Sequence, residues 1–202
     1  MPKHYDKAYF DRWYRGAQRV NSAGEVRRKV SLAVAVTEYF IQEPLRSVLD
    51  IGCGEGAWLG HLQALRPNVE YMGLDPSEYV VRRYGQKRNI RQASFGELPS
   101  LRIAKKVDLV VCSDVLHYVG EHEIRAGIAE IARVANGLAF IEVLTKEDDI
   151  VGDLRDLARR PAAWYIKTFR DAGLINVAPY CFLAPGRASV VAELEIPDVK
   201  RD

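Results

Sequence analysis

Glycine occupies every second position between residues 52 and 56, directly after an apolar run that ends in an acid. The segment reads Val48-Leu49-Asp50-Ile51-Gly52-Cys53-Gly54-Glu55-Gly56. Glycine permits positive φ and has no Cβ, so the backbone of such a turn can approach a ligand closely. Apolar residues at helical spacing follow, at Trp58, Leu59, Leu62 and Leu65. Strand, glycine turn and helix in this order predict a site for a nucleotide-like cofactor, bound by backbone N–H groups and the start of the helix.

Three further polar segments follow, each at the expected end of a strand. Gly73-Leu74-Asp75-Pro76-Ser77 places a carboxylate 19 residues after Gly56, where it can accept two hydrogen bonds from a ribose diol. The loop Ala93-Ser94-Phe95-Gly96-Glu97-Leu98-Pro99 comes next, and then a strand from Asp108 that ends in Ser113-Asp114-Val115-Leu116-His117-Tyr118. Ligands bind beyond the carboxyl ends of the strands in open α/β sheets, so we expect all four segments at one edge.

Two kinds of cofactor fit the glycine pattern. Gly52-x-Gly54-x-x-Ala57 satisfies the dinucleotide fingerprint, and Asp75 stands at about the right distance from it. Asp50 favours the other kind, because a carboxylate before the glycines suits a cofactor with an ammonium and a sulfonium better than it suits a pyrophosphate. An antiparallel tail, expected from the two β-rich runs at the C-terminus, also fits less well with a nicotinamide-binding fold.

With these motifs, residues 46–196 resemble the class I S-adenosylmethionine-dependent methyltransferases. The segments that carry the resemblance are VLDIGCGEG, the acid in GLDPS, ASFGELP, DLVVCSDVLHYV, RVANGLAFIEV and the terminal hairpin. The resemblance implies that the glycine turn surrounds the methionine part of the cofactor and that Asp75 binds the ribose hydroxyls. It implies that Ser94 and Phe95 contact adenine and that Ser113 lies near the methyl group. Ser94 departs from the family, which often has Asp or another polar acceptor there.

The predicted cofactor contacts therefore come from all four segments and from the N-terminal region. They are Asp50, Gly52, Cys53, Gly54, Gly56, Asp75, Pro76, Ser94, Phe95, Ser113, Asp114 and Tyr14. We expect Cys53 to serve as a small side chain between glycines, with no nucleophilic role. An alternative for Asp50 is a carboxylate that only caps nearby amides, and an alternative for Asp75 is an N-cap of the following helix.

His117 and Glu142 are the predicted catalytic residues. His117 follows the fourth strand, and histidine can accept a proton near neutral pH. A histidine that only holds its loop together is the alternative. Glu142 lies inside the fifth strand, where an acid is costly unless it is paired or stands at the open end of the sheet. Tyr118, Trp164 and Tyr165 are further candidates for lining a pocket, although aromatic residues there are more often core.

The first 45 residues are predicted to be helical and to form a lid or cap. Tyr5, Tyr9, Phe10, Trp13 and Tyr14 recur at helical spacing, and a second helix is expected over residues 27–41 with Val30, Val34, Thr37 and Ile41 on one face. The segment Asn21-Ser22-Ala23-Gly24 between them is typical of a turn. The aromatic helix is expected either to pack on the sheet or to close over the cofactor and exclude water.

From residue 46 onward strands and helices are expected to alternate. The predicted strands are 47–51, 70–74, 90–93, 107–112 and 138–144, with helices near 57–65, 77–87, 121–135 and 162–172. Two β-rich runs, 176–183 and 188–196, are joined by Ala184-Pro185-Gly186-Arg187 and predict an antiparallel hairpin. The fold class is therefore α/β: a Rossmann-like doubly wound sheet, mostly parallel, with an antiparallel C-terminal hairpin and helices on both faces. We expect one domain over residues 1–202, with a cofactor-binding core over 46–202.

Composition excludes several functional classes. The 202 residues have 48% hydrophobic content and a net charge of +2, which do not point to nucleic acid or an anionic membrane. No apolar run is long enough to span a bilayer, and the N-terminus lacks the apolar core of a signal peptide. Three cysteines without a CxxC motif argue against a structural zinc site and favour a reducing compartment, so we expect a cytoplasmic protein without a metal site. We expect a monomer or a homodimer.

The sequence thus predicts an enzyme that transfers the methyl group of S-adenosylmethionine to a small molecule, with S-adenosylhomocysteine as the product. The loop Ser113-Asp114-Val115-Leu116 lacks the Asn/Asp-Pro-Pro-Tyr/Phe pattern of enzymes that methylate exocyclic amines of nucleic acid bases, and no Pro-Cys dipeptide suggests cytosine chemistry. Two other functions stay open: a nicotinamide-dependent oxidoreductase, and a protein that binds S-adenosylmethionine without catalysis.

Overall fold

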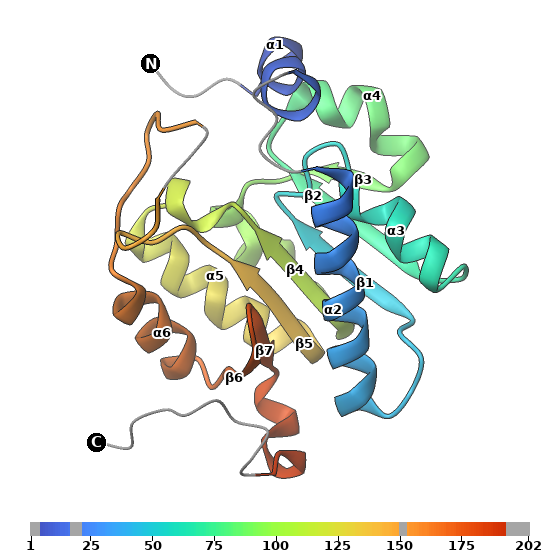
Figure 1. Cartoon of the computed structure of the whole chain (residues 1–202), viewed down its shortest axis with the longest axis vertical. Helices are drawn as coiled ribbons and strands as arrows, with labels where there is room; N and C mark the ends of the chain where they lie inside the picture. Colours follow the sequence, from blue (N-terminus) through green and yellow to red (C-terminus); the bar gives the residue numbers. More distant parts are fainter. Residues whose placement is uncertain (1–4, 17–21, 150–152, 193–202) are drawn as a thin grey trace.

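The computed structural model describes residues 5–16, 22–149 and 153–192 (Figure 1). The N-terminal part contains α1 (Lys7–Phe10), the π-helical segment η1 (Asp11–Arg15) and the long helix α2 (Ala23–Ile41). Strands and helices then alternate: β1 (Ser47–Ile51), α3 (Ala57–Leu65), β2 (Glu70–Asp75), α4 (Glu78–Arg88), β3 (Ile90–Gln92), η2 (Phe95–Leu101), β4 (Val107–Ser113), η3 (Leu116–Tyr118), α5 (Glu121–Val134) and β5 (Ala135–Glu142). The C-terminal part adds α6 (Ala162–Asp171), β6 (Ile175–Ala178), β7 (Cys181–Leu183) and η4 (Pro185–Val190).

The described residues form one seven-stranded sheet in the order β3-β2-β1-β4-β5-β7-β6. Strands β1 to β5 run parallel, and β7 is antiparallel to both β5 and β6. Ile51, the last residue of β1, stands opposite Leu74 of β2 and Cys112 of β4. The three strands therefore end together, and the loops that follow them share one edge of the sheet. The order reverses between β1 and β4, which is where ligands bind in doubly wound sheets.

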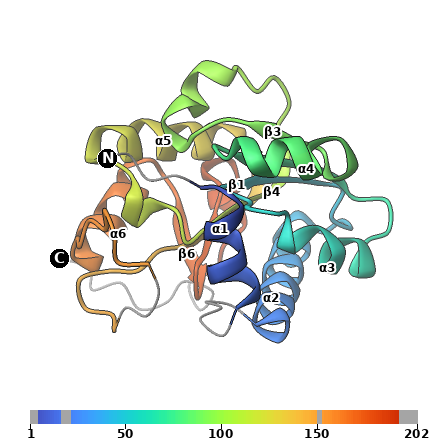
Figure 2. The same ribbon diagram turned by 90° about the horizontal axis from the view of Figure 1, so that it is seen from above.

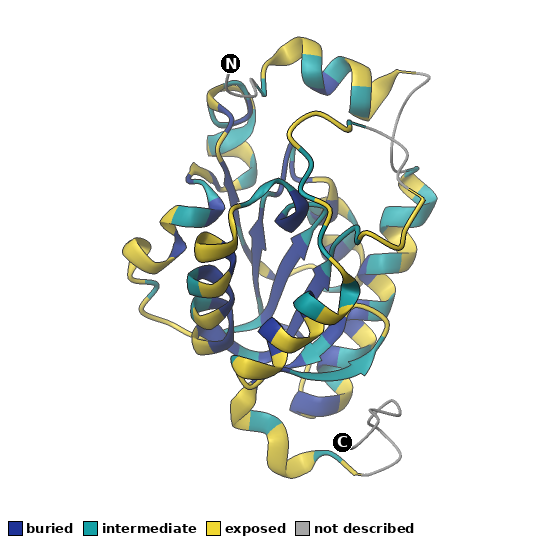
Figure 3. Cartoon of the chain, turned by 90° about the vertical axis from the view of Figure 1, so that its left-hand side faces the viewer, coloured by how far each residue is buried: buried dark blue, intermediate teal, exposed yellow. Residues whose placement is uncertain are grey.

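Side chains alternate across the strands and meet helices on both faces. Leu49 and Ile51 of β1 pack in one cluster with apolar residues of α5 and α6, whereas Val48 packs in the other with residues of α2 and α3. Figure 3 shows the resulting buried strands between helices that are buried on one side only. The predicted doubly wound α/β sheet, parallel with antiparallel strands at its C-terminal end, is confirmed.

Helix α2 begins earlier than the sequence indicated. Ser22 is its N-cap: the Ser22 hydroxyl accepts from the Glu25 amide at 3.2 Å, and the Glu25 carboxylate accepts from the Ser22 amide at 2.6 Å. This reciprocal capping box holds the first turn, so Ala23 and Gly24 are helical rather than part of a turn. Asn21 lies outside the described residues. The predicted stripe Val30, Val34, Thr37 and Ile41 is buried, as expected.

The antiparallel hairpin lies elsewhere than predicted. The run 176–183 is not one strand but breaks between β6 and β7 at Pro179 and Tyr180, because proline has no amide hydrogen for the ladder and Tyr180 takes a φ of 60°. The hairpin is thus made by β6 and β7. The expected second strand over 188–196 is wrong in its described part, because residues 185–190 form η4 with Pro185 at the first position.

Strand β5 also begins earlier, at Ala135 instead of residue 138, and α5 ends at Val134. Gly137, in the added part of the strand, is closely packed: a Cβ there would lie 2.6 Å from the Ile41 side chain of α2 and 2.7 Å from the Asp108 carbonyl oxygen. Of the helices in the described ranges, none has the length and apolar character needed to cross a bilayer.

Candidate functional site

The glycine turn after β1 is held in a conformation that favours glycine. Gly52, Gly54 and Gly56 have φ values of 69°, 54° and 77°. The Gly52 and Cys53 amides both donate to the Leu74 carbonyl, at 2.7 and 3.1 Å, which ties the turn to β2. A Cβ on Gly52 would stand 2.3 Å from the Val115 side chain. The turn therefore needs glycine both for its backbone angles and for the close approach of the loop after β4.

Asp75 joins the end of β2 to the glycine turn. One of its carboxylate oxygens accepts from the Gly54 amide at 2.8 Å, and the other accepts from the Ser77 amide at 2.9 Å. The residue is 6% exposed, and burial raises its pKa, although the two amides oppose this shift. Ser77, not Asp75, caps α4, because the Ser77 hydroxyl accepts from the Val80 amide at 3.2 Å. Each Asp75 oxygen keeps acceptor capacity toward a ligand.

A cavity of about 290 Å³ lies at this edge of the sheet. Its walls come from the N-terminal segment, from the loops after β1, β2, β3 and β4, and from the start of α5. The lining residues are Tyr5, Tyr9, Phe10, Tyr14, Gly52, Asp75, Pro76, Ala93, Ser94, Phe95, Gly96, Asp114, Val115, Tyr118, Val119 and Glu123. Seven of the predicted cofactor contacts are among them: Tyr14, Gly52, Asp75, Pro76, Ser94, Phe95 and Asp114.

Asp50 lies under the turn and not on the cavity wall. It stands two residues after Val48 in β1 and therefore points to the same face, where the Tyr71 hydroxyl donates to its carboxylate at 2.8 Å. Burial raises the pKa of Asp50 to about 7; the Tyr71 hydrogen bond opposes this and the charge of Asp75 adds to it. Cys53, Gly54 and Gly56 also stand outside the lining.

Ser94 and Phe95 reach the cavity in different ways. The Ser94 amide and hydroxyl both donate to the Glu97 carboxylate, at 2.7 Å each, so this acid is turned toward its own loop. The Phe95 ring points away into the core: a Cβ on Gly127 of α5 would lie 2.2 Å from it. Phe95 is 5% exposed, so what it offers the cavity is its backbone more than its ring.

Ser113 and Asp114, neighbours at the end of β4, have side chains that point in different directions. The Ser113 hydroxyl donates to Glu142, which also pairs with Lys29 of α2 at 2.7 Å. Neither Ser113 nor Glu142 lines the cavity. Asp114 takes a φ of 61°, and this left-handed residue turns its side chain to the cavity instead. The acid in β5 is thus paired, and Asp114 rather than Ser113 is the polar residue that β4 contributes to the wall.

His117 is buried behind the cavity. It is 1% exposed, its Nδ1 accepts from the Leu144 amide at 3.5 Å, and its ring meets the Tyr118 ring edge-on at 4.2 Å between centroids. The expectation that His117 faces a substrate does not match this position. Its contacts hold the loop after β4 to the segment after β5, while Tyr118 beside it lines the cavity.

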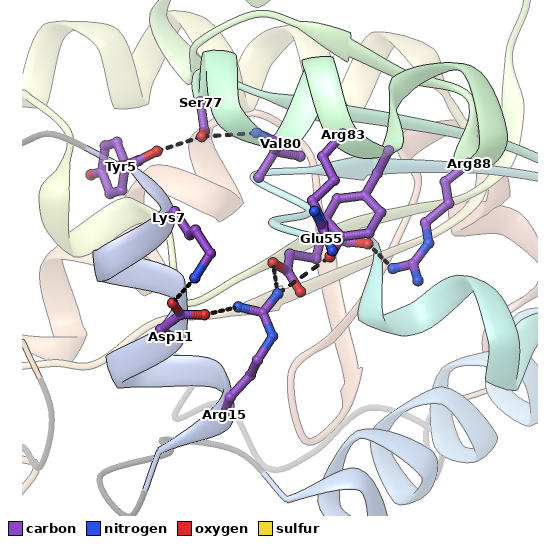
Figure 4. A network of polar contacts seen from close by, with 10 residues as sticks. Tyr5, Lys7, Asp11, Arg15, Glu55, Ser77, Val80, Arg83 and Arg88 are labelled. Carbon is purple, nitrogen blue, oxygen red and sulfur yellow. Dashed lines mark hydrogen bonds and ion pairs between the residues drawn. The ribbon is translucent and has the colours of Figure 1, made fainter.

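The N-terminal helix α1 lies beyond the ends of the sheet strands (Figures 1 and 2), and Tyr5, Tyr9, Phe10 and Tyr14 of the N-terminal segment line the cavity. Figure 4 shows what ties it down: Arg15 pairs with Glu55 of the glycine turn, and the Ser77 hydroxyl donates to the Tyr5 carbonyl. Within the segment, Asp11 accepts from both Lys7 and Arg15 (Figure 4). The segment is therefore attached to the loops after both β1 and β2.

Tyr14 brings its hydroxyl into the turn. The residue is 38% exposed, yet its hydroxyl lies 2.7 Å from the position that a Cβ on Gly54 would take. Burial raises the pKa of Tyr14 well above its usual value, and Tyr9, Asp75 and Asp114 add to this shift. The two carboxylates thus give the region around this hydroxyl a negative potential, which favours a positively charged group.

Sequence reasoning missed several cavity residues: Gly96, Val115, Val119 and Glu123. Val115 and Val119 look like ordinary apolar residues in the sequence, and nothing marks them as exposed to a ligand. Glu123 had a usable signal, because it stands three residues after Gly120 at the start of a helix, on the same helical face as Gly127.

Known proteins share this fold and part of this sequence. Residues 49–137 match the family model described as a methyltransferase domain. A solved S-adenosylmethionine-dependent methyltransferase from Archaeoglobus fulgidus is 17% identical with a TM-score of 0.63, over 84% of this chain and 74% of that chain. Comparison with curated protein sequences gives no match.

Two further solved structures are similar over most of their length. The magnesium protoporphyrin IX methyltransferase from Synechocystis, solved with S-adenosylhomocysteine bound, is 21% identical with a TM-score of 0.56, over 84% of this chain and 86% of that chain. A sugar N-methyltransferase from Streptoalloteichus is 19% identical with a TM-score of 0.59, over 86% and 91% of the two chains.

The strand order, with β7 antiparallel between β5 and β6, and the cavity beyond β1, β2 and β4 define the class I methyltransferase fold. Residues 49–137 therefore match a methyltransferase domain, and the described residues share the fold of solved S-adenosylmethionine-dependent methyltransferases.

Proposed function

We propose that this chain transfers the methyl group of S-adenosylmethionine to a small-molecule acceptor bound under the N-terminal segment. The observation that carries the proposal is the single cavity in which Gly52, Asp75, the Ser94–Gly96 loop and Asp114 converge. These residues come from the loops after β1, β2, β3 and β4, so seven of the twelve predicted cofactor contacts line one cavity near the point where the strand order reverses.

The residues present fit the cofactor. Asp75 has two oxygens with remaining acceptor capacity for a ribose diol, and its carboxylate is already fixed by the Gly54 and Ser77 amides. Gly52 leaves backbone exposed at the cavity for the methionine part. Ser94 and Phe95 border the place for adenine. The lining charges of the described cavity are the carboxylates Asp75, Asp114 and Glu123, which suit a cofactor that carries a sulfonium and an ammonium.

When bound, the cofactor supplies a methyl group on a positively charged sulfur, already activated for in-line displacement. The protein's part is then to align the acceptor, to exclude water and to take up a proton if the acceptor releases one. We assign the proton-accepting role to Asp114, which lines the cavity, in place of His117 and Glu142, which do not. The tyrosines of the N-terminal segment exclude water, and we propose that this segment is a lid.

The acceptor is expected to be uncharged or cationic. The described lining contains three carboxylates and no lysine, arginine or histidine, so an anionic acceptor would meet like charges in a partly buried space. The aromatic residues Tyr5, Tyr9, Phe10 and Tyr118 provide apolar and cation-binding ring surface. The solved neighbours include methyltransferases named for a porphyrin and for a sugar, which supports a small acceptor in this fold.

Asp75→Ala tests the proposal most simply. Loss of the ribose contact and of the Gly54 anchor should weaken S-adenosylhomocysteine binding by about 100-fold, roughly the worth of two hydrogen bonds to a charged group. Glu70→Ala is the matched control, because Glu70 is an exposed acid at the opposite end of the same strand. Titration calorimetry measures both variants. Equal affinity of Asp75→Ala and the wild type would contradict the proposed position of the cofactor.

A further inference from the structure

Glu123 lines the cavity, and one of its carboxylate oxygens accepts no hydrogen bond from the part of the chain that the structure describes. It is the third residue of α5, and its Oε2 accepts from the Gly120 amide at 3.2 Å in the cap of that helix. Its Oε1 makes no hydrogen bond to any described residue, and the side chain lines the cavity. A carboxylate oxygen in this position is available to a donor on the bound molecule.

Packing places this oxygen beside the loop that follows β3. Gly127 lies one helical turn after Glu123 on the same face of α5, and it receives the Phe95 ring so closely that a Cβ there would stand 2.2 Å away. This contact brings the start of α5 against Gly96. A Cβ on Gly96 would lie 2.4 Å from Glu123 Oε1, so only glycine lets the carboxylate reach this place.

The loop itself offers the cavity no acid. Ser94 has a hydroxyl and no carboxylate, and Glu97, the acid within this loop, accepts hydrogen bonds from the Ser94 amide and hydroxyl. The Ser94 hydroxyl hydrogen is directed to Glu97 and leaves only lone pairs for a ligand. A ligand amine at this end of the cavity therefore finds its charged acceptor on α5, at Glu123.

We propose that Glu123 accepts a hydrogen bond from the exocyclic amine of the cofactor's adenine; this assignment rests on the proposed function. With the ribose at Asp75 after β2, the base extends toward the loop after the next strand outward, β3, where Ser94 and Gly96 line the cavity. The carboxylate acts there as a selective acceptor. A base with a carbonyl oxygen in place of the amine would offer it no hydrogen, and the two oxygen acceptors would repel each other.

S-inosylhomocysteine, which carries oxygen where S-adenosylhomocysteine has the amine, tests this directly. The wild type should bind S-adenosylhomocysteine at least about tenfold more tightly than the inosine analogue. Glu123→Gln keeps the capping pattern of α5, and its amide can also donate to the oxygen of the analogue. In this variant the ratio of the two affinities should fall by about threefold or more relative to the wild type. Calorimetry or competition binding measures all four affinities.

Glu121→Gln is the control, because it removes an acid from the first turn of the same helix without touching the cavity lining. It should discriminate as the wild type does. Discrimination by Glu123→Gln equal to that of the wild type, with normal S-adenosylhomocysteine binding in both, would overturn the role of Glu123 and leave the proposed function standing. No binding of S-adenosylhomocysteine to the wild type would overturn both.

Discussion

At the scale of single residues, the types of the residues and their positions in the sequence predicted where the site lies. They did not predict which side chains point into it. Asp75 and Asp114 line the cavity, whereas Asp50 and Ser113, equally close to strand ends, do not. Asp50 follows the two-residue period of β1 to the face shared with Tyr71. Ser113 turns to Glu142, and the left-handed φ of Asp114 reverses the direction at the next residue. Such turns are decided by tertiary contacts, which a single sequence does not reveal.

Asp50 should make the stability of the protein depend on pH. Its folded pKa of about 7 is above the ordinary value of 3.8, so the folded state binds a proton more tightly than the unfolded state. This contribution to the free energy of unfolding is therefore fully present below the unfolded pKa and is lost as the pH rises through about 7. Asp50→Asn keeps an acceptor for the Tyr71 hydroxyl but does not titrate.

We expect Asp50→Asn to gain stability relative to the wild type between about pH 4 and pH 8, because only the wild type must bury an ionised carboxylate at the higher pH. Urea unfolding of both proteins across this range measures the difference. Asp11 and Glu25 have lowered pKa values, so their contributions to the free energy of unfolding change with pH in the opposite direction. Both proteins contain these residues, so their contributions cancel in the comparison. Parallel stability profiles of the two proteins would show that Asp50 does not titrate in this window.

At the scale of elements, the N-terminal segment is the part that we propose to act as a lid over the cavity. Its aromatic side chains line the cavity, and the pair Arg15–Glu55 and the Ser77–Tyr5 hydrogen bond attach it to the loops after β1 and β2. Its aromatic residues were evident from the sequence, but Glu55 and Ser77, the partners of Arg15 and Tyr5, are 40 and 72 residues away from them. Only the folded chain brings them together.

Arg15→Ala should loosen this segment. Arg15 is 40% exposed and Glu55 14% exposed in their side chains, so the pair is worth at most about 1 kcal/mol. We therefore expect S-adenosylhomocysteine to dissociate up to about fivefold faster, since the segment must open for release. Stopped-flow fluorescence can follow this, with Trp13 in the segment as a reporter.

Lys7→Ala is the control for that measurement. It removes the Lys7–Asp11 pair, which lies within the segment and does not reach the loops around the cavity. Its dissociation rate should stay at the wild-type value. A rate for Arg15→Ala that equals that of Lys7→Ala would mean that the Arg15–Glu55 pair does not control release.

At the scale of the whole molecule, the sheet followed from the alternation of apolar strands with amphipathic helices, and β1 to β4 lie within one residue of their predicted bounds. Where the prediction was wrong, a local feature decided the structure. Pro179 divides the last strands, Pro185 starts a helical turn, and β5 begins at Ala135, in a part of the strand where α2 packs closely on Gly137. The two prolines act locally, whereas the close contact at Gly137 depends on Ile41 and Asp108, which are distant in sequence.

The central claim is that the cavity holds S-adenosylmethionine and not a nicotinamide dinucleotide. Both fit the glycine pattern, but the three carboxylates of the cavity wall favour a cationic cofactor and oppose a pyrophosphate. Calorimetric titration of the wild-type protein with S-adenosylmethionine and, separately, with NADH tests this most directly. We predict micromolar binding of S-adenosylmethionine and no binding of NADH. Binding of NADH alone would contradict the account.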